Sequence, residues 1–97
     1  MALLEPISRL GAQLKHLGVC DMFAGGELPS SFFERCTELR FIDFGQMNLS
    51  GPIPASIGKL SKLTQLLLSR NKLQGCIPEE LGNCTRLTPL SCHTNNL

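Results

Sequence analysis

The hydrophobic positions of this chain recur at intervals that fit neither a helix nor a strand. An amphipathic helix requires spacings of three and four over several turns, and a half-buried strand requires steps of two. In the second half of the chain the steps are instead 3, 2, 5, 4 and 4, which place apolar side chains at Leu63, Leu66, Leu68, Leu73, Ile77 and Leu81. A longer periodicity must therefore organise the chain.

The same intervals also begin 24 positions earlier, where they give Leu39, Ile42, Phe44, Leu49, Ile53 and Ile57. The residues GPIP at 51–54 align in the same way with GCIP at 75–78. A third copy begins at Leu87, and a looser copy that is one residue longer begins at Leu14. A fixed period of this length indicates stacked structural units, which is a solenoid.

The period divides the chain into a degenerate repeat, two full repeats and a truncated half repeat, at residues 14–38, 39–62, 63–86 and 87–97. Residues 1–13 allow two interpretations. Ile7 and Leu10 continue to Leu14 and Leu17 at helical spacing, which favours an amphipathic helix that caps the solenoid. The segment PISRL also fits the tail of a preceding repeat.

Each position of the repeat has a predicted task. Leu66 and Leu68 are two residues apart, so they point inward from one face of a short strand, and neighbouring units pair such strands into a parallel sheet. Asn71 and Asn95 are expected to turn inward after the strand and to bond the backbone of adjacent units, whose polar groups are costly to bury unpaired.

The opposite side of each unit is predicted to be a short helical turn. In the segment 78–82, Pro78 suits the first position of a helix and the two glutamates after it suit the positive end of the helix. Gly75 is expected to allow the preceding bend, and Gly82 to end the turn.

Residues 63–84 resemble the pattern LxxLxLxxNxLxGxIPxxLGxL of the plant-type extracellular leucine-rich repeat, and the resemblance covers about 85 of the 97 residues. It implies an α/β-type solenoid: a right-handed superhelix of about 3.5 repeats with a parallel β-sheet on the concave face and 3-10 or helical turns on the convex side. Met22 and Met47 stand where the family carries asparagine, so the asparagine ladder is expected to be interrupted there.

Composition excludes several classes of function. A net charge of +1 with 18% charged residues provides no electrostatic basis for binding nucleic acid or an acidic membrane surface. The chain has no apolar run long enough for a transmembrane helix. Glu5 and Pro6 lie where the apolar region of a signal peptide should be, so we expect no signal peptide here and a fragment of a longer parent protein.

Five cysteines raise the question of metal binding or disulfides. Zinc sites use ligand pairs two to four residues apart, a spacing that these cysteines lack, so no metal or other cofactor is expected. The repeat places Cys36, Cys84 and Cys92 inward as small apolar residues, and Cys20 and Cys76 outward on opposite sides of the coil.

No catalytic constellation is recognisable in the sequence. His16 and Cys20 lie about 13 Å apart along an extended strand, too far for a nucleophile and its base. We therefore expect no enzymatic activity.

Two triplets fit the N-glycosylation motif: NLS, which begins at Asn48, and NCT, which begins at Asn83. Both fall at outward loop positions of the repeat. Asparagine-rich turns also produce such triplets by chance.

If the inward positions fill the core, the alternate strand positions form the concave surface. The candidate ligand contacts there are Arg40, Phe41, Asp43, Gln65, Leu67, Arg70 and His93. Phe41 and Leu67, on neighbouring strands near Arg40 and Arg70, are typical of a binding hot spot. Single exposed apolar side chains are nevertheless ordinary on protein surfaces.

The resemblance implies a recognition module from the ectodomain of a plant receptor-like kinase or receptor-like protein, on the outer side of the plasma membrane or in the cell wall. Its partners would be a protein or peptide ligand or a co-receptor ectodomain, with no nucleic acid and no direct membrane contact by this segment. The alternatives are a secreted inhibitor of a wall-degrading polygalacturonase, which is built from similar repeats, or a non-functional truncated fragment.

Overall fold

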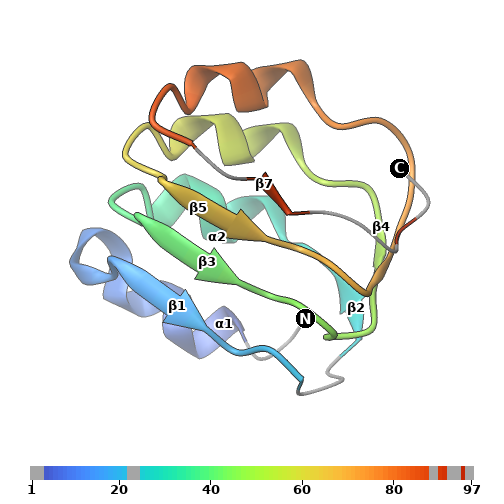
Figure 1. Cartoon of the computed structure of the whole chain (residues 1–97). Helices are drawn as coiled ribbons and strands as arrows, with labels where there is room; N and C mark the ends of the chain where they lie inside the picture. Colours follow the sequence, from blue (N-terminus) through green and yellow to red (C-terminus); the bar gives the residue numbers. More distant parts are fainter. Residues whose placement is uncertain (1–3, 22–24, 88–89, 92–94, 96–97) are drawn as a thin grey trace.

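The computed structural model of the protein describes residues 4–21, 25–87, 90–91 and 95. Within them the chain winds through stacked coils, each of which contributes one strand to a parallel sheet (Figure 1). In sheet order the strands are β1 (His16–Gly18), β3 (Phe41–Asp43), β5 (Gln65–Leu67) and β7 (Leu90–Ser91). The predicted solenoid with a parallel sheet is thus confirmed.

The register of this sheet follows the sequence repeat. Ile42 pairs with Leu66, and Leu66 with Leu90, a step of 24 residues each time. Leu17 pairs with Ile42, a step of 25 residues, because the first unit is one residue longer. The extra residue is accommodated outside the strands, so the inward-facing positions stay aligned from coil to coil.

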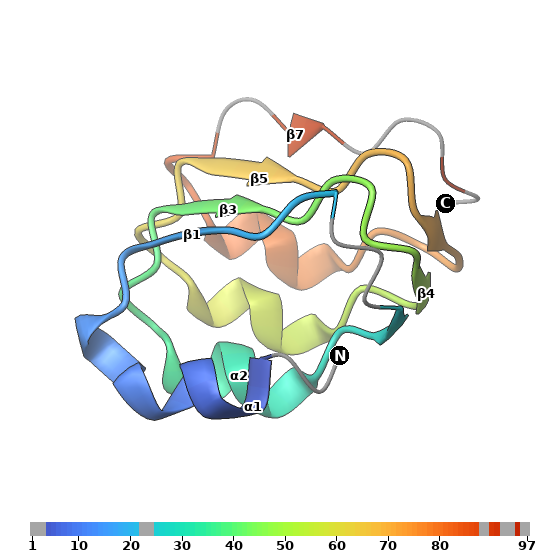
Figure 2. The same ribbon diagram turned by 90° about the horizontal axis from the view of Figure 1, so that it is seen from below.

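Helical turns form the layer opposite the sheet (Figure 2). They are α2 (Ser30–Arg35), η2 (Ala55–Lys59) and η3 (Glu79–Asn83), which pack against one another in that order. At the N-terminal end, α1 (Leu4–Ile7) continues into η1 (Ser8–Gln13), and η1 packs against α2. The helical segment at residues 4–13 therefore lies in line with the convex turns of the later coils.

The boundaries of these turns differ from the sequence prediction in two details. Pro78 immediately precedes η3 and has extended backbone angles, so it is not the first helical residue. Gly82 lies inside η3, which ends at Asn83, so the prediction that Gly82 ends the turn was wrong. The chain instead leaves the turn at Cys84, whose backbone N–H donates to the Leu81 carbonyl at 3.0 Å while its side chain is buried.

A second parallel sheet, which the sequence did not predict, lines one side of the solenoid. It consists of β2 (Gly26–Glu27), β4 (Leu49–Gly51) and β6 (Lys72–Leu73), in that order. Gly26, Gly51 and Gly75 occupy one repeat position and all adopt positive φ, at 84°, 74° and 88°. A Cβ at Gly51 would also lie 2.6 Å from the side chain of Glu27 on the adjacent coil. The bend predicted at Gly75 is confirmed, and it recurs in each coil.

The core is a continuous column of the inward repeat positions. Ile42, Phe44, Leu66 and Leu68 are fully buried, and Leu17 is nearly so. Phe32 and Phe33 of α2 extend the column beneath the first coils, with their rings packed edge to face at a centroid distance of 5.4 Å. Truncating one such buried leucine to alanine typically costs about 2–5 kcal/mol of stability.

Cys36 and Cys84 belong to this core, as predicted. Both are buried, whereas Cys20 and Cys76 are exposed, and these four cysteines are all free thiols. The Cys84 thiol donates to the Ile57 carbonyl at 3.4 Å, which links it to the coil before its own. Cys92 lies outside the described residues.

Asn71 turns its side chain inward and bonds the backbone of two coils. Its Oδ1 accepts the backbone N–H groups of Met47 and Leu49, at 2.9 and 3.0 Å. Its Nδ2 donates to the carbonyls of Phe44 and Leu68, also at 2.9 and 3.0 Å. The predicted role of Asn71 is confirmed.

The ladder continues on one side of Asn71 and stops on the other. Asn95 repeats the pattern, because its Oδ1 accepts the Leu73 N–H at 3.0 Å and its Nδ2 donates to the Leu68 carbonyl at 2.8 Å. Met47 occupies the equivalent position in the preceding coil, with a fully buried, apolar side chain. The predicted interruption is therefore confirmed at Met47, while Met22 lies outside the described residues.

We predict that Asn71→Leu, which keeps the branched side-chain shape of asparagine but removes its polar atoms, strongly destabilises the chain. The Met47 and Leu49 N–H groups would lose their acceptor, and each buried unpaired group costs about 1–3 kcal/mol. Chemical denaturation should show the loss. The matched control is Gln65→Leu, the same exchange of an amide at an exposed position on β5. Equal effects of the two substitutions would contradict the role assigned to Asn71.

Candidate ligand-binding surface

The concave surface is built from the strand positions that alternate with the core positions. On β1, β3 and β5 the middle residue is buried, and the residues on either side of it are at least partly open to solvent. Of the candidate contacts, Arg40, Gln65 and Arg70 are exposed, and Phe41, Asp43 and Leu67 are half-buried. His93 lies outside the described residues. The strand alternation thus places Phe41, Asp43, Gln65 and Leu67 away from the core, and Arg40 and Arg70 are exposed beside the strands.

Phe41 and Leu67 lie diagonally across two paired strands. The register sets Phe41 opposite Gln65, and Leu67 opposite Asp43. Gly18, opposite Asp43 on the other side, has no side chain to cover the Phe41 ring, and a Cβ there would lie 3.9 Å from the ring atom Cε2. The ring therefore spreads toward β1 and keeps one part open to solvent.

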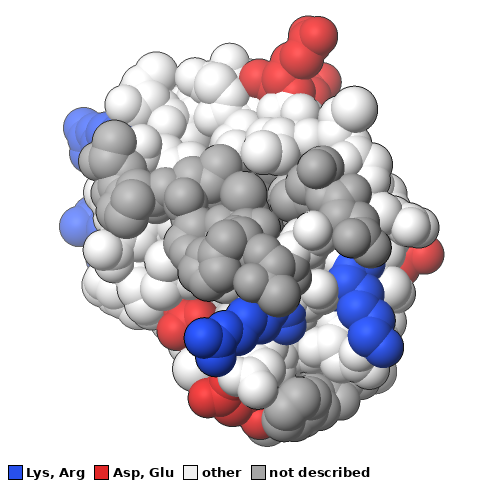
Figure 3. All heavy atoms as spheres, turned by 45° about the vertical axis from the view of Figure 1, so that its right-hand side comes forward, with Lys and Arg blue, Asp and Glu red and all other residues white. Residues whose placement is uncertain are grey.

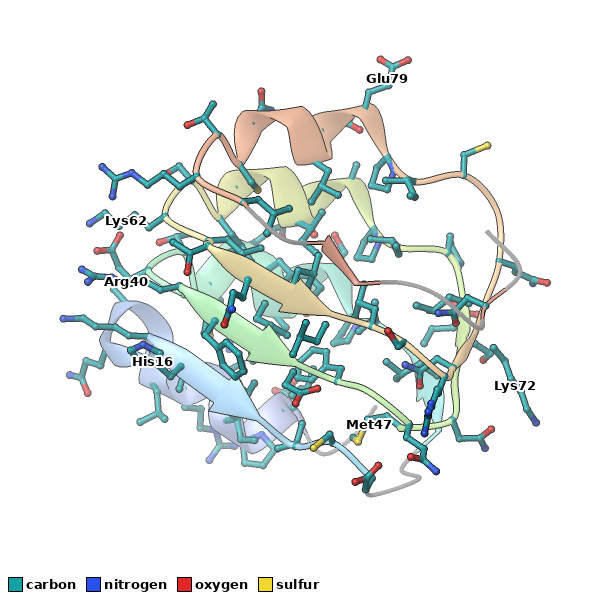
Figure 4. All side chains as sticks on the ribbon, viewed as in Figure 1. His16, Arg40, Met47, Lys62, Lys72 and Glu79 are labelled. Carbon is teal, nitrogen blue, oxygen red and sulfur yellow. The ribbon has the colours of Figure 1, made fainter. Side chains whose placement is uncertain are left out.

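The two arginines lie at opposite ends of the strands. Arg40 directly precedes β3, and Figure 4 shows it with His16 and Lys62 along the edge where the strands begin. Its carbonyl accepts the Thr64 hydroxyl at 2.8 Å and so ties two coils together. Arg70 instead follows β5, near the other edge. Arg40 and Arg70 thus flank the apolar pair, Phe41 and Leu67, from opposite ends of the strands and do not form one basic patch.

A shallow hollow of about 270 Å³ opens where the strands end, lined by Cys20, Asp21, Asp43, Gly45, Gln46, Ser69 and Arg70. Asp21, Gln46 and Arg70 share one repeat position and all adopt left-handed backbone, with φ of 63°, 56° and 61°. The coils are tied there by backbone bonds from Asp21 to Gly45 and from Gln46 to Ser69, both 2.9 Å. Left-handed backbone is strained for residues with a side chain, so these hydrogen bonds hold the turns in place.

Asp43 determines the electrostatics of this hollow. Its Oδ1 accepts the Gly45 N–H at 3.1 Å, which fixes the carboxylate beside the end of β3. The negative charge of Asp43, with a smaller contribution from Asp21, raises the pKa of the exposed Cys20 thiol. The sequence pattern had placed Asp43 and Arg70 on the concave surface but did not reveal the hollow, because the strand pattern alone does not show where the turns converge.

The described part of the surface carries charges of both signs. Basic and acidic side chains of the described residues both occur on the face drawn in Figure 3. Among the described residues, no three His, Cys, Asp or Glu side chains lie close enough to hold a metal ion. The described part of the chain also has no helix of the length and apolarity that crossing a membrane requires.

Comparison with known proteins agrees with this architecture. The family described as Leucine Rich Repeat matches residues 62–84. Receptor-like protein 52 of Arabidopsis thaliana is 36% identical over 61 residues, which are 63% of this chain and 8% of that protein. The chain is built from leucine-rich repeats. Its repeats are of the plant type, and it spans less than a tenth of the length of this curated relative.

Solved plant ectodomains have the same fold. The leucine-rich repeat ectodomain of the Arabidopsis thaliana receptor kinase GASSHO1/SCHENGEN3, in complex with CASPARIAN STRIP INTEGRITY FACTOR 2, is 44% identical with a TM-score of 0.69. The match covers 73% of this leucine-rich repeat chain and 8% of that one. The Arabidopsis receptor kinase HAESA, in complex with the peptide hormone IDA and the co-receptor SERK1, is 30% identical with a TM-score of 0.68, over 82% and 16% of the two chains.

We predict that Asp43→Asn accelerates alkylation of Cys20 near neutral pH. Asparagine keeps an acceptor for the Gly45 N–H but removes the negative charge, so the pKa of Cys20 falls and more thiolate is present at a given pH. Mass spectrometry after timed alkylation should show the pH midpoint for Cys20 shifted downward, and the extent of Cys76 labelling should be the same in the variant and the parent chain.

Two controls accompany this measurement. Asp21→Asn should have a smaller effect than Asp43→Asn, because Asp21 contributes less to the shift of Cys20. Cys36 and Cys84 should react only after denaturation, since burial both hides these thiols and raises the pKa of each. If Asp43→Asn changed the alkylation rates of Cys20 and Cys76 equally, the charge of Asp43 would not be the cause of the raised pKa of Cys20.

Proposed function

We propose that this chain is a recognition module from the ectodomain of a plant receptor-like kinase or receptor-like protein. Its concave sheet would contact a peptide or protein ligand, or the ectodomain of a co-receptor. The chain itself would perform no catalysis, and in a receptor kinase the phosphoryl transfer would belong to a separate domain. In the parent protein the module would lie on the outer side of the plasma membrane or in the cell wall.

The observation that carries this proposal is the partly open apolar pair on a rigid sheet. Phe41 and Leu67 lie on paired strands whose buried neighbours, Ile42 and Leu66, anchor them in the core. Side chains held in this way lose little conformational entropy on binding, which favours affinity. An aromatic side chain among polar neighbours is also the composition that is typical of binding hot spots.

The polar neighbours of this pair would provide specificity. Arg40 and Gln65 lie beside Phe41, and Asp43 lies opposite Leu67. Together they offer donors, acceptors and both signs of charge along an extended ligand. The plant receptors with similar repeats also support the proposal, since GASSHO1/SCHENGEN3 was solved with CASPARIAN STRIP INTEGRITY FACTOR 2 and HAESA with a peptide hormone and a co-receptor.

We predict that Phe41→Ala and Leu67→Ala each weaken binding by about 2 kcal/mol or more, the cost typical of a buried interface anchor. The 97-residue chain would be immobilised and screened by a biosensor against synthetic secreted plant peptides and co-receptor ectodomains. The variants would then be titrated with whatever probe binds.

The matched controls are Glu79→Ala and Lys59→Ala on the convex side. Glu79 projects away from the sheet (Figure 4), and the 3.9 Å contact of Lys59 with Glu34 is an exposed ion pair of small energetic value. Both should leave affinity unchanged. A loss confined to these convex variants would place the ligand on the other face, and equal losses in all four, with lowered melting temperatures, would indicate unfolding.

A further inference from the structure

The convex side of the solenoid carries a polar hollow that ligand recognition on the concave sheet does not use. It has a volume of about 440 Å³ and crosses the three neighbouring turns α2, η2 and η3. The polar side chains in its lining are Ser30, Glu34, Ser56, Lys59, Glu80 and Asn83. Hydroxyl, carboxylate, ammonium and amide groups are thus all present within one surface depression.

Two features fix the shape of this hollow. The Ser30 hydroxyl donates to the Ser56 hydroxyl at 3.0 Å, and the Ser56 hydroxyl donates to the Ser30 carbonyl at 2.9 Å, which joins α2 to η2. Gly58 lets η3 approach η2 closely, because a Cβ at Gly58 would lie only 2.5 Å from the Glu80 carbonyl oxygen. The lining is therefore set by the packing of the turns.

Asn83 stands at the border of this hollow in the triplet Asn83-Cys84-Thr85. It is the last residue of η3 and is exposed, as is Thr85, whereas Cys84 between them is buried. The amide acceptor and the hydroxyl that the glycosylation motif requires are thus both on the surface, while the middle residue anchors the segment in the core.

We propose that Asn83 is N-glycosylated and that the sugars nearest to it cover the polar hollow. The Asn83 amide nitrogen would attack the first sugar carbon of a lipid-pyrophosphate-linked oligosaccharide, supplied with the transferase by the secretory pathway. A carbon–nitrogen bond forms, the carbon–oxygen bond to the pyrophosphate breaks, the amide loses one proton, and the lipid pyrophosphate leaves. This inference rests on the proposed extracellular function, which takes the chain through that pathway.

The second sequon, Asn48-Leu49-Ser50, has the same organisation and is proposed as a second acceptor. Asn48 is exposed with φ of 58°, Leu49 is fully buried in β4, and Ser50 is half-buried. Neither Asn48 nor Asn83 belongs to β1, β3 or β5, the strands that form the concave surface. Glycans at both sites would leave this surface free for a ligand.

The test is to produce the chain in plant leaves behind a secretion signal and to locate its glycans by mass spectrometry, before and after an amidase cleaves the sugar–asparagine bond. We expect a glycan on Asn83 and one on Asn48. Asn83→Gln and Thr85→Ala should each remove the same glycan, Asn48→Gln should remove the other, and Thr85→Ser should retain both. An unmodified Asn83 in chain recovered from secretory membranes would overturn the proposal.

A second measurement tests where the sugars lie. Lys59 lines the hollow, whereas Lys72 is exposed on β6, near the other side of the solenoid (Figure 4). The measurement uses the Asn48→Gln variant, because Lys72 is paired with Ser50 of the second sequon. Removing its remaining glycan with the amidase should increase the rate of Lys59 acylation severalfold and leave that of Lys72 unchanged. Equal rates at Lys59 before and after removal would show that the sugars do not cover the hollow.

These results are separable from those on ligand binding. If Asn83 were unmodified in a chain whose ligand binding depends on Phe41 and Leu67, the glycosylation proposal would be wrong and the proposed recognition function would stand. A glycosylated chain that binds none of the synthetic peptides or co-receptor ectodomains, before or after the amidase, would count against the proposed function alone.

Discussion

The carboxamide of Asn71 satisfies backbone groups at the point where its own coil and the preceding coil bend out of the sheet. A bend breaks the strand ladder and leaves N–H and carbonyl groups inside the solenoid without partners in their own strand. Asn71 supplies an acceptor for two N–H groups of the preceding coil and donors for carbonyls of both coils. Because Asn95 repeats the arrangement, the spacing between the coils is set by a side chain as well as by the sheet.

The organisation of the surfaces follows from this stacking. The register keeps Ile42 and Leu66 in the core, so Phe41 and Leu67 are displayed on the concave side without a further element to support them. The convex side is made of short turns whose separation depends on individual local contacts. An example is the pair of hydrogen bonds between Ser30 and Ser56. One face is therefore a regular sheet suited to an extended ligand, and the other is an uneven polar surface.

At Met47, which stands where the repeat has asparagine, the first coils are held together without the side-chain hydrogen bonds of an asparagine. The Met47 side chain is fully buried and contributes apolar contact where Asn71 contributes hydrogen bonds. The Met47 carbonyl still accepts the Gly25 N–H at 2.8 Å, so the backbone link between these coils persists. Hydrophobic packing thus replaces part of the polar network at this end of the solenoid.

The sequence by itself determined the features that repeat within one coil. The period identified the inward positions, the buried role of Cys36 and Cys84, the bonding of Asn71 and the alternation that displays Phe41 and Leu67, because each of these depends on local spacing. Only the tertiary structure decided what depends on the distance between coils. The second sheet and the two hollows arise where turns of different coils approach one another. Their approach is governed by contacts between residues 22 or more positions apart, such as Gly58 with Glu80 and Gly51 with Glu27, which no single repeat encodes.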